Sequence, residues 1–188
     1  MATHVALLRG INVGGSNKVP MAELRQVVAA LGHQDVTTYI QSGNVLFSTQ
    51  STDTAALASG LEQAIEQAFG IRAGVIVVSR AELAQVISDN PYPDEPNPKA
   101  LHAVFLAAEP PAARKEAVAQ AQQAAAAAGS RDTATHVGRV LYLHTPDGYG
   151  RSELAARLSR SSGRLPPGEA GTARNWATVT KLLDLSGG

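Results

Sequence analysis

The sequence predicts an α+β protein built as a tandem duplication of βαββαβ units, and three observations support this prediction. Apolar runs typical of strands alternate with segments of helical periodicity in the order βαββαβ. A stretch with four prolines in nine residues, 90–98, interrupts this pattern. Beyond it the elements return at an offset of about 97 to 98 residues, which indicates an internal repeat. Each unit should therefore be of the ferredoxin-like kind, an antiparallel sheet with helices packed on it.

The first copy has clear start and stop signals for its helices. Asp53 is a good N-cap and Gly70 a good helix end, and Ser79 with Glu82 forms a capping box for a shorter helix. An earlier helix stops before Gly32. The expected helices cover 21–31, 54–69 and a segment that begins after residue 79. The expected strands are apolar runs at 4–8, 36–40, 45–47 and 75–78.

The second copy follows a proline-rich stretch that suits neither helix nor sheet. Three segments are predicted, which are a first domain at 1–90, a linker at 91–100 and a second domain at 101–188 with a C-terminal helix. His102 repeats His4 at the start of an apolar strand, and an alanine-rich helix spans 110–128. The copies also differ, because the loop at 107–111 has neither glycines nor cations. Any function of the corresponding loop should belong to the first copy alone.

The composition restricts the class of protein without naming a function. The chain has 188 residues, 44% of them hydrophobic, and a formal net charge of zero, which argues against indiscriminate binding to nucleic acid. It contains no cysteine, so disulfide and thiolate chemistry are excluded, and an intracellular, cytoplasmic protein is expected. No apolar run approaches the roughly 20 residues that a membrane helix requires, so no membrane partner is expected.

The best candidate for a ligand site is the glycine-rich loop at 9–18, between the first strand and the first helix. Its spacing matches neither a Walker A loop nor a dinucleotide fingerprint. Glycines that expose backbone N–H groups before a helix nevertheless favour an anion, and nearby cations would add to the attraction. The alternative is a tight turn with solvated cations. The candidate residues of this loop are Arg9, Gly10, Asn12, Gly14, Gly15 and Lys18.

Three groups of residues resemble the hallmarks of a known bacterial family. They are the loop at 9–15 with Lys18, the turn at 39–44, and the C-terminal group Thr172, Arg174, Asn175, Trp176, Thr178, Lys181 and Leu182. In these segments the chain closely resembles the domain of unknown function 1697 family, from Val5 to Leu183. The resemblance implies the fold and the positions of a site, and it implies no activity.

Other chemistry finds little support in the sequence. The five histidines lie in different elements without metal-ligand spacing, so no metal and no cofactor is expected. Ser42 precedes Gly43 and is expected to be a turn residue rather than a nucleophile. Two function classes remain. The first is a site that binds a phosphate-bearing small ligand, such as a nucleotide or a cofactor-like molecule, either with or without catalysis. The second is a module for RNA or single-stranded nucleic acid, in which Tyr39 could stack on a base. A scaffold that only dimerises is a third reading, so a monomer or a homodimer is expected.

Topology suggests where polar residues should gather. Because the first and second strands of a βαββαβ unit are parallel, the glycine-rich loop should share one end of the sheet with the turn at 41–44. In the second copy the third and fourth strands should bring Arg151 close to Arg174, with Asn175 holding the last helix. We expect these corners to form a composite site between the halves. The residues expected to line it are Arg9, Asn12, Lys18, Gln41, Asn44, Arg151 and Arg174, with Asn175 holding the helix that orients Arg174. The other candidate ligand-binding residues are Gly10, Gly14, Gly15 and Ser42.

Overall fold

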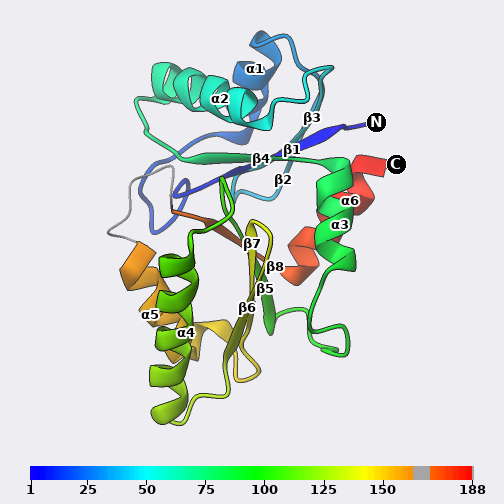
Figure 1. Ribbon diagram of the computed structural model, residues 1–188. Coiled ribbons are helices and arrows are strands. Elements are labelled where there is room, and N and C mark those ends of the chain that lie inside the picture. Colours follow the sequence, from blue (N-terminus) through cyan, green and yellow to red (C-terminus); the bar gives the residue numbers. More distant parts are fainter. Residues whose placement is uncertain (163–169, 188) are drawn as a thin grey trace. The chain divides into compact units, whose positions relative to one another are not determined.

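A computed structural model describes residues 1–162 and 170–187, and Figure 1 shows the order of their elements. The first half contains β1 (His4–Leu8), α1 (Met21–Ala30), β2 (Gln34–Tyr39), β3 (Asn44–Ser48), α2 (Thr54–Phe69), β4 (Val75–Ser79) and α3 (Arg80–Ser88). The second half contains β5 (Leu101–Phe105), α4 (Ala112–Ala127), β6 (Thr133–Val137), β7 (Val140–His144), the 3-10 helix η1 (Tyr149–Arg151), α5 (Glu153–Ser162), β8 (Thr172–Asn175) and α6 (Trp176–Gly187). The order is βαββαβα in each half.

The strand order confirms the duplicated fold. One four-stranded sheet has the order β2-β3-β1-β4 and the other the order β6-β7-β5-β8, so corresponding strands occupy corresponding places. Every pairing in both sheets is antiparallel. The segment at 172–175 is short and polar, and it forms the strand β8 beside β5. Both halves are therefore complete βαββαβ units of the ferredoxin-like kind.

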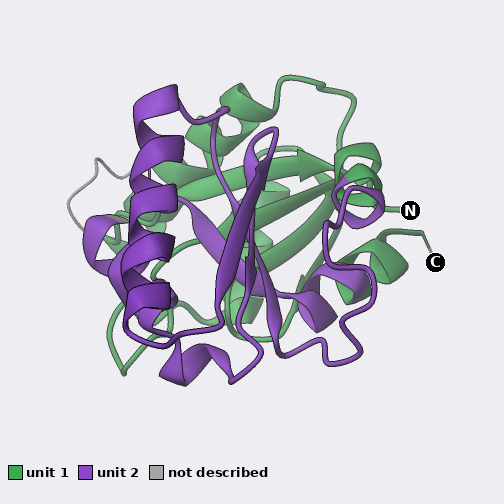
Figure 2. Ribbon diagram, turned by 60° about the horizontal axis from the view of Figure 1, so that its bottom comes forward, with its two compact units in different colours: residues 1–85, 181–188 green, residues 86–180 purple. Residues whose placement is uncertain are grey.

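The chain forms two compact units, which Figure 2 colours separately. Unit 1 comprises Met1–Gln85 and Lys181–Gly188, and unit 2 comprises Val86–Thr180. The segments expected from the sequence, 1–90, 91–100 and 101–188, differ from these units in two respects. The proline-rich stretch belongs to unit 2, and the end of the last helix belongs to unit 1. Both α3 and α6 thus contain residues of each unit.

Unit 1 is organised around β1, which is buried along its whole length between β3 and β4. Helices α1 and α2 cover one face of this sheet (Figure 1). Leu57, Leu61 and Ile65 recur every four residues on the buried side of α2. The side chain of Asp53 accepts hydrogen bonds from two amides of the first turn of α2, and Gly70 ends the helix with a φ of 67°. These local signals are the ones on which the sequence prediction of this helix depends.

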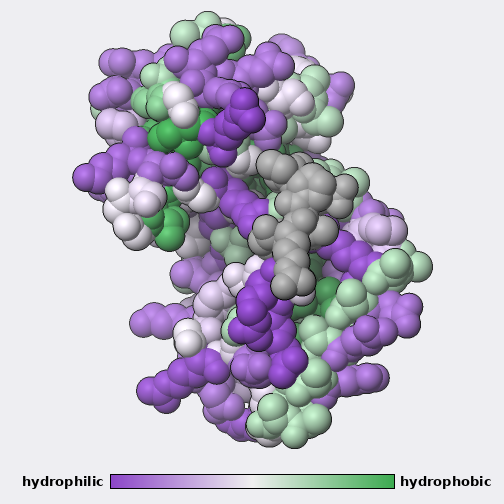
Figure 3. All heavy atoms as spheres, turned by 90° about the vertical axis from the view of Figure 1, so that its left-hand side faces the viewer, coloured by the Kyte–Doolittle hydropathy of each residue, from purple (hydrophilic) through white to green (hydrophobic). Residues whose placement is uncertain are grey.

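Unit 2 packs α4 and α5 side by side against its sheet (Figure 1). Its helix-side core contains Ala125, Leu143, Leu154 and Ala155. In α4, Val118 and Ala125 are the buried residues, and most of the other side chains are exposed. Many of these exposed side chains are alanines. Figure 3 shows such small apolar side chains among hydrophilic ones over the part of the surface where α4 lies. No helix in the described residues is long and apolar enough to span a membrane.

The terminal strands of the two sheets have side chains bonded to their backbone. Glu62 of α2 accepts a hydrogen bond from the amide of Val75 in β4 at 2.8 Å. Gln122 of α4 accepts one from the amide of Ala134 in β6 at 2.7 Å. Strands at the edge of a sheet expose unpaired amides to which other strands can add. Side chains from covering helices occupy two of these amides here.

We expect the whole chain to unfold in one thermal transition. Because α3 and α6 each contain residues of both units, neither helix can unfold with one unit alone. Differential scanning calorimetry should give one peak whose calorimetric and van't Hoff enthalpies agree. Two resolved peaks would contradict this expectation.

Candidate functional site

The side chain of Asn12 organises the glycine-rich loop of unit 1. Its Oδ1 accepts a hydrogen bond from the amide of Val19 at 2.9 Å, and its Nδ2 donates to the carbonyl of Val19 at 3.0 Å. The same Nδ2 also donates to the carbonyl of Gln41 at 3.0 Å. Asn12 itself has a φ of 54°, a conformation that asparagine tolerates better than most residues. One side chain therefore closes the loop and connects it to the β2–β3 turn.

A second asparagine closes the loop further out. Asn17, with a φ of 50°, donates from Nδ2 to the carbonyl of Gly10 at 2.8 Å, and its own carbonyl accepts from the amide of Asn12 at 3.0 Å. The amide of Ser16 donates to the carbonyl of Val13 at 3.0 Å, which makes a tight turn at the tip. Both asparagines thus fix the shape of the backbone by side-chain bonds.

The tip of the loop presents backbone donors to solvent. Val13, Gly14 and Gly15 are exposed. Val13 pairs with Ser16 in an antiparallel bridge, whereas within the described part of the chain no acceptor is bonded to the amides of Gly14 and Gly15. Gly14 and Gly15 have φ values of 59° and 81°, in the left-handed region that glycine accepts at low cost. Of the two cations that flank this tip in sequence, Arg9 is half-buried and Lys18 is exposed. The loop can therefore offer several N–H donors and positive charge to an anion.

The loop and the β2–β3 turn lie at the same end of the unit 1 sheet, as the topology predicts. The amide of Leu8 donates to the carbonyl of Gly43 at 2.8 Å. Gly43 has a φ of 78°, and a Cβ at this position would lie 2.7 Å from Cβ of Leu8 and 2.9 Å from Cδ1 of Ile11. Only glycine fits here, for steric and conformational reasons together. Ile40 beside it has a φ of 50°, which is rare for a β-branched residue.

The remaining turn residues have different roles. Gln41 and Ser42 are exposed, whereas Asn44 has 0% exposed surface. Asn44 donates from Nδ2 to the carbonyl of Tyr39 at 3.1 Å and to Oγ of Ser42 at 3.0 Å. Its amide group therefore stabilises the turn from inside, and the exposed Gln41 and Ser42 are the turn residues that a ligand can reach.

The candidate residues of unit 2 are not equally accessible. Arg151, in η1, is exposed. Arg174 lies within β8 rather than at the start of the last helix, and it is 8% exposed. Its Nη1 donates to Oγ1 of Thr172 and to the carbonyl of Ala173, both at 2.9 Å. Burial lowers the pKa of the Arg174 guanidinium to about 10. A ligand can therefore reach Arg151 more easily than Arg174.

Asn175 holds the start of the last helix, as the sequence predicts. Its Oδ1 accepts a hydrogen bond from the amide of Thr178 at 2.8 Å, which is the geometry of an N-cap. In register, Asn175 lies opposite His102, and Ser79, which caps α3, lies opposite His4. The two copies therefore place a histidine opposite the helix cap in the same way.

The composite site formed by both units stays a prediction.

Sequence reasoning missed a pair of rings in unit 2. The ring of Tyr149 lies 4.2 Å from the ring of His102, measured between centroids. Within the described residues, Nδ1 of His102 is buried without a hydrogen-bond partner. In unit 1 the hydroxyl of Thr3 lies 2.8 Å from Nδ1 of His4, but Leu101 precedes His102 and has no hydroxyl. Burial lowers the pKa of His102 to about 4.

Unit 2 also has a basic side chain at the end of its sheet that corresponds to the glycine-rich corner, outside the loop at 107–111. The amide of Leu106 donates to the carbonyl of Arg139 at 2.9 Å, in the same way as Leu8 bonds to Gly43 in unit 1. The Nη1 atom of Arg139 lies 3.4 Å from the carbonyl of Leu106, to which it donates. The loop at 107–111 itself contains neither glycines nor cations, and Arg139 adds a cation to this corner from outside that loop. Arg139 comes from the β6–β7 turn, and only the duplicated topology could have indicated it.

The geometry defines a class of protein, a duplicated ferredoxin-like α+β protein with a glycine-rich corner in its first copy. The family model described as "Protein of unknown function (DUF1697)" matches residues 1–142, so the chain belongs to this family. The family named from the sequence motifs is thereby confirmed, although the C-terminal motif lies outside the matched residues. No curated protein matches the sequence.

A solved structure agrees with this fold. It is described as the structure of conserved bacterial protein SP0830 from Streptococcus pneumoniae. The identity is 23%, the match covers 98% of each chain, and the TM-score is 0.72. At this identity the similarity shows the fold alone. Within residues 1–162 and 170–187, no group of three or more metal-ligating side chains is placed to hold a metal ion.

Replacing Gly43 by alanine should lower the free energy of unfolding by more than about 2 kcal/mol, because the new Cβ meets Leu8 and Ile11 as well as an unfavourable φ. Gly138→Ala is the matched control. Gly138 lies in the corresponding turn of unit 2, with a φ of 53° and open space around it. Gly138→Ala should lower the free energy of unfolding by about 1 kcal/mol, from backbone strain alone. Urea denaturation measures both values, and equal losses would show that the steric contact does not matter.

The imidazole of His102 should titrate near pH 4 in an NMR pH titration, because burial favours its neutral form. The pKa of the folded protein lies below the ordinary value of 6.5, so this neutral ring stabilises the fold above that pH. The stabilisation is lost as the pH falls toward 4. Tyr149→Ala uncovers the ring and should raise its midpoint. Tyr92→Ala, which removes a ring from His144 instead, should leave the midpoint of His102 unchanged.

Proposed function

We propose that the glycine-rich loop of unit 1 binds the phosphate group of a small ligand, such as a nucleotide or a phosphorylated metabolite. One observation carries the proposal. Gly14 and Gly15 at the tip are exposed, and within the described residues neither of their amides has a hydrogen-bond acceptor. Successive backbone donors in a glycine-rich turn form a concavity that suits an anion. Because Asn12 and Asn17 fix this turn, little conformational entropy is lost when a ligand binds.

Charge around the loop supports the same function. Arg9 and Lys18 flank the tip in sequence, and α1 begins at Met21 with no side-chain cap on its first amides. The positive end of a helix dipole attracts an anion. Exposed Gln41 and Ser42 lie on the turn that Asn12 bonds to the loop, so they can contact other parts of a ligand. The site has donors for phosphate, and no reaction is assigned to it.

The alternative, a module for single-stranded nucleic acid, has less support. Such modules stack bases on accessible aromatic rings of the sheet. In unit 1, register places Tyr39 on the face opposite α1 and α2, and it is half-buried. In unit 2, Phe105 and Tyr142 are only 2% and 1% exposed. A scaffold that dimerises by adding strands is also disfavoured, because side chains already bond to amides of β4 and β6.

The proposal predicts binding of inorganic pyrophosphate at low ionic strength. In a titration followed by NMR, the amides of Gly14 and Gly15 should shift most, because they are the proposed donors. Arg9→Ala and Lys18→Ala should each weaken binding about tenfold, the effect of losing one charge-assisted hydrogen bond. Both variants should change stability by about 0.5 kcal/mol or less.

Lys99→Ala is the matched control, because Lys99 is an exposed lysine in unit 2. It should leave binding unchanged. A short single-stranded RNA titrated in the same way distinguishes the two function classes. Shifts confined to the face of the sheet, with none at residues 13–15, would favour nucleic-acid binding and contradict the phosphate site. The absence of any shift with either probe would contradict both.

A further inference from the structure

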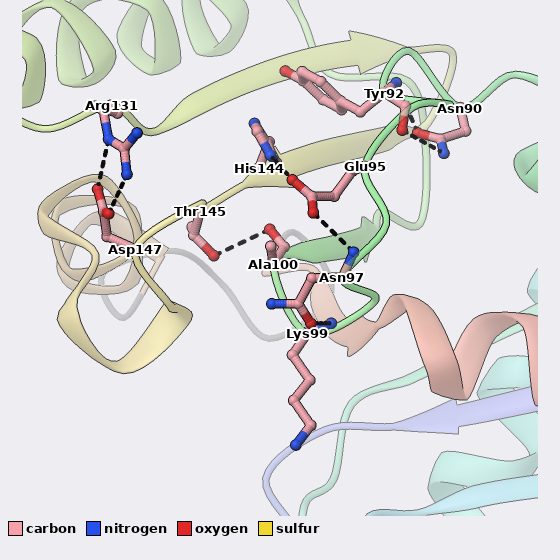
Figure 4. A network of polar contacts seen from close by, with 10 residues as sticks. All are labelled: Asn90, Tyr92, Glu95, Asn97, Lys99, Ala100, Arg131, His144, Thr145 and Asp147. Atoms are coloured by element: carbon pink, nitrogen blue, oxygen red, sulfur yellow. Dashed lines mark hydrogen bonds and ion pairs between the residues drawn. The ribbon is translucent and has the colours of Figure 1, made fainter.

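The proline-rich segment at 90–98, here called the strap, is held against the sheet of unit 2 by its side chains. The ring of Tyr92 stacks on the ring of His144 in β7, with centroids 4.9 Å apart and an angle of 26° between the planes. Its hydroxyl lies 3.0 Å from Oγ1 of Thr135 in β6, within hydrogen-bond distance. Figure 4 shows the strap passing over this end of the sheet. No regular backbone ladder is needed to hold it there.

Glu95 makes the only contact between the strap and the sheet that involves an ionised side chain within the described residues. Its Oε2 lies 2.5 Å from Nε2 of His144, and its Oε1 accepts the amide of Asn97 at 2.9 Å. The two side chains are 16% and 21% exposed, so the contact is largely shielded from solvent. Hydrogen bonds from His144 and from the backbone of Asn97 hold the pKa of Glu95 below its usual value. The ionised carboxylate is therefore the form that fits.

The other charged groups of Figure 4 do not compete for this carboxylate. Arg131 and Asp147 pair with each other, and Lys99 extends away from Glu95 (Figure 4). Asp94 is exposed. The strap also contains its own turns, because Asn90 bonds to the backbone of Tyr92 in both directions. Four prolines restrict its free conformations further, so the strap can stay ordered locally even when it is detached.

We infer that the Glu95–His144 contact is a latch that fixes the strap to the sheet and that acid releases it while the sheet stays folded. Release uncovers His144 and Thr135 on the face of the sheet opposite α4 and α5. The direction of the pH effect follows from the carboxylate. Its stabilisation is present above the ordinary pKa of 4.5 and is lost as the pH falls through the lower value of the folded protein. The strap is thus a conformational device within unit 2.

Hydrogen exchange of the full chain, followed by NMR, tests this inference. The amide of Asn97 reports on the latch because it donates to Glu95, and the amides of Leu141 and Leu143 report on the sheet. At pH 7, Glu95→Ala should lower the protection of Asn97 about tenfold or more, with a change of less than about twofold in β7, as expected for local opening. Asp94→Ala is the matched control, since it removes an exposed carboxylate from the same strap, and it should change neither value.

Two further arms keep the inference falsifiable if Glu95→Ala fails to fold. In the unchanged protein, the protection factor of Asn97 should fall as the pH drops below the ordinary carboxyl pKa of 4.5, and it should fall before that of the sheet does. In Glu95→Gln, which retains a carbonyl acceptor without a charge, this pH dependence should disappear. Unchanged protection of Asn97 in Glu95→Ala, or loss of protection in the strap and β7 together, would overturn the inference.

Discussion

The side chain of Asn12 is the constraint on which the glycine-rich corner depends. It satisfies both backbone polar atoms of Val19 and the carbonyl of Gln41, at a point where the chain has left the sheet. Backbone groups without partners are costly, so a long loop needs such substitutes for ladder bonds. Because these bonds join the base of the loop to the β2–β3 turn, the tip can keep its own amides directed at solvent. The hydrogen bonds of Asn12 therefore both fix the conformation of the corner and leave the backbone donors at its tip accessible to a ligand.

The duplication conserves geometry more strictly than chemistry. A strand amide bonds to a turn carbonyl at the same corner of both units, through Leu8 and Gly43 in one and through Leu106 and Arg139 in the other. The glycine permits close packing under Leu8, whereas the arginine adds a cation at its corner. The histidines opposite the helix caps diverge similarly, since His4 has a hydroxyl neighbour and His102 has an aromatic one. Topology is held by the backbone pairing, and the side chains around it are free to differ.

Signals confined to neighbouring residues predicted most of the fold. The caps at Asp53 and Ser79, and the 97-residue repeat, depend on local chemistry and on comparison of the chain with itself, and the structure confirms them. The shared corner of the loop and the β2–β3 turn followed from topology.

Other features depend on contacts between distant residues, which periodicity does not encode. Proline content indicates that 90–98 is irregular, but not that Tyr92 stacks on His144. The charge of Arg174 suggests exposure, yet the side chain is only 8% exposed in β8. Leu31 fits the apolar side of α1 but is 43% exposed just beyond its end.

The side chains that bond to the sheet edges have a consequence for how the protein behaves at high concentration. A foreign strand that approaches β4 or β6 must first displace Glu62 or Gln122 from the amide it occupies. Cross-β assemblies grow by recruiting exposed strand amides, so each displaced side chain adds to the barrier against nucleation. Glu62 and Gln122 do not occupy corresponding positions in the two units. Glu62 bonds to β4, the last strand of unit 1, whereas Gln122 bonds to β6, the second strand of unit 2. Each half therefore blocks strand addition at a different edge of its sheet, unit 1 at β4 and unit 2 at β6.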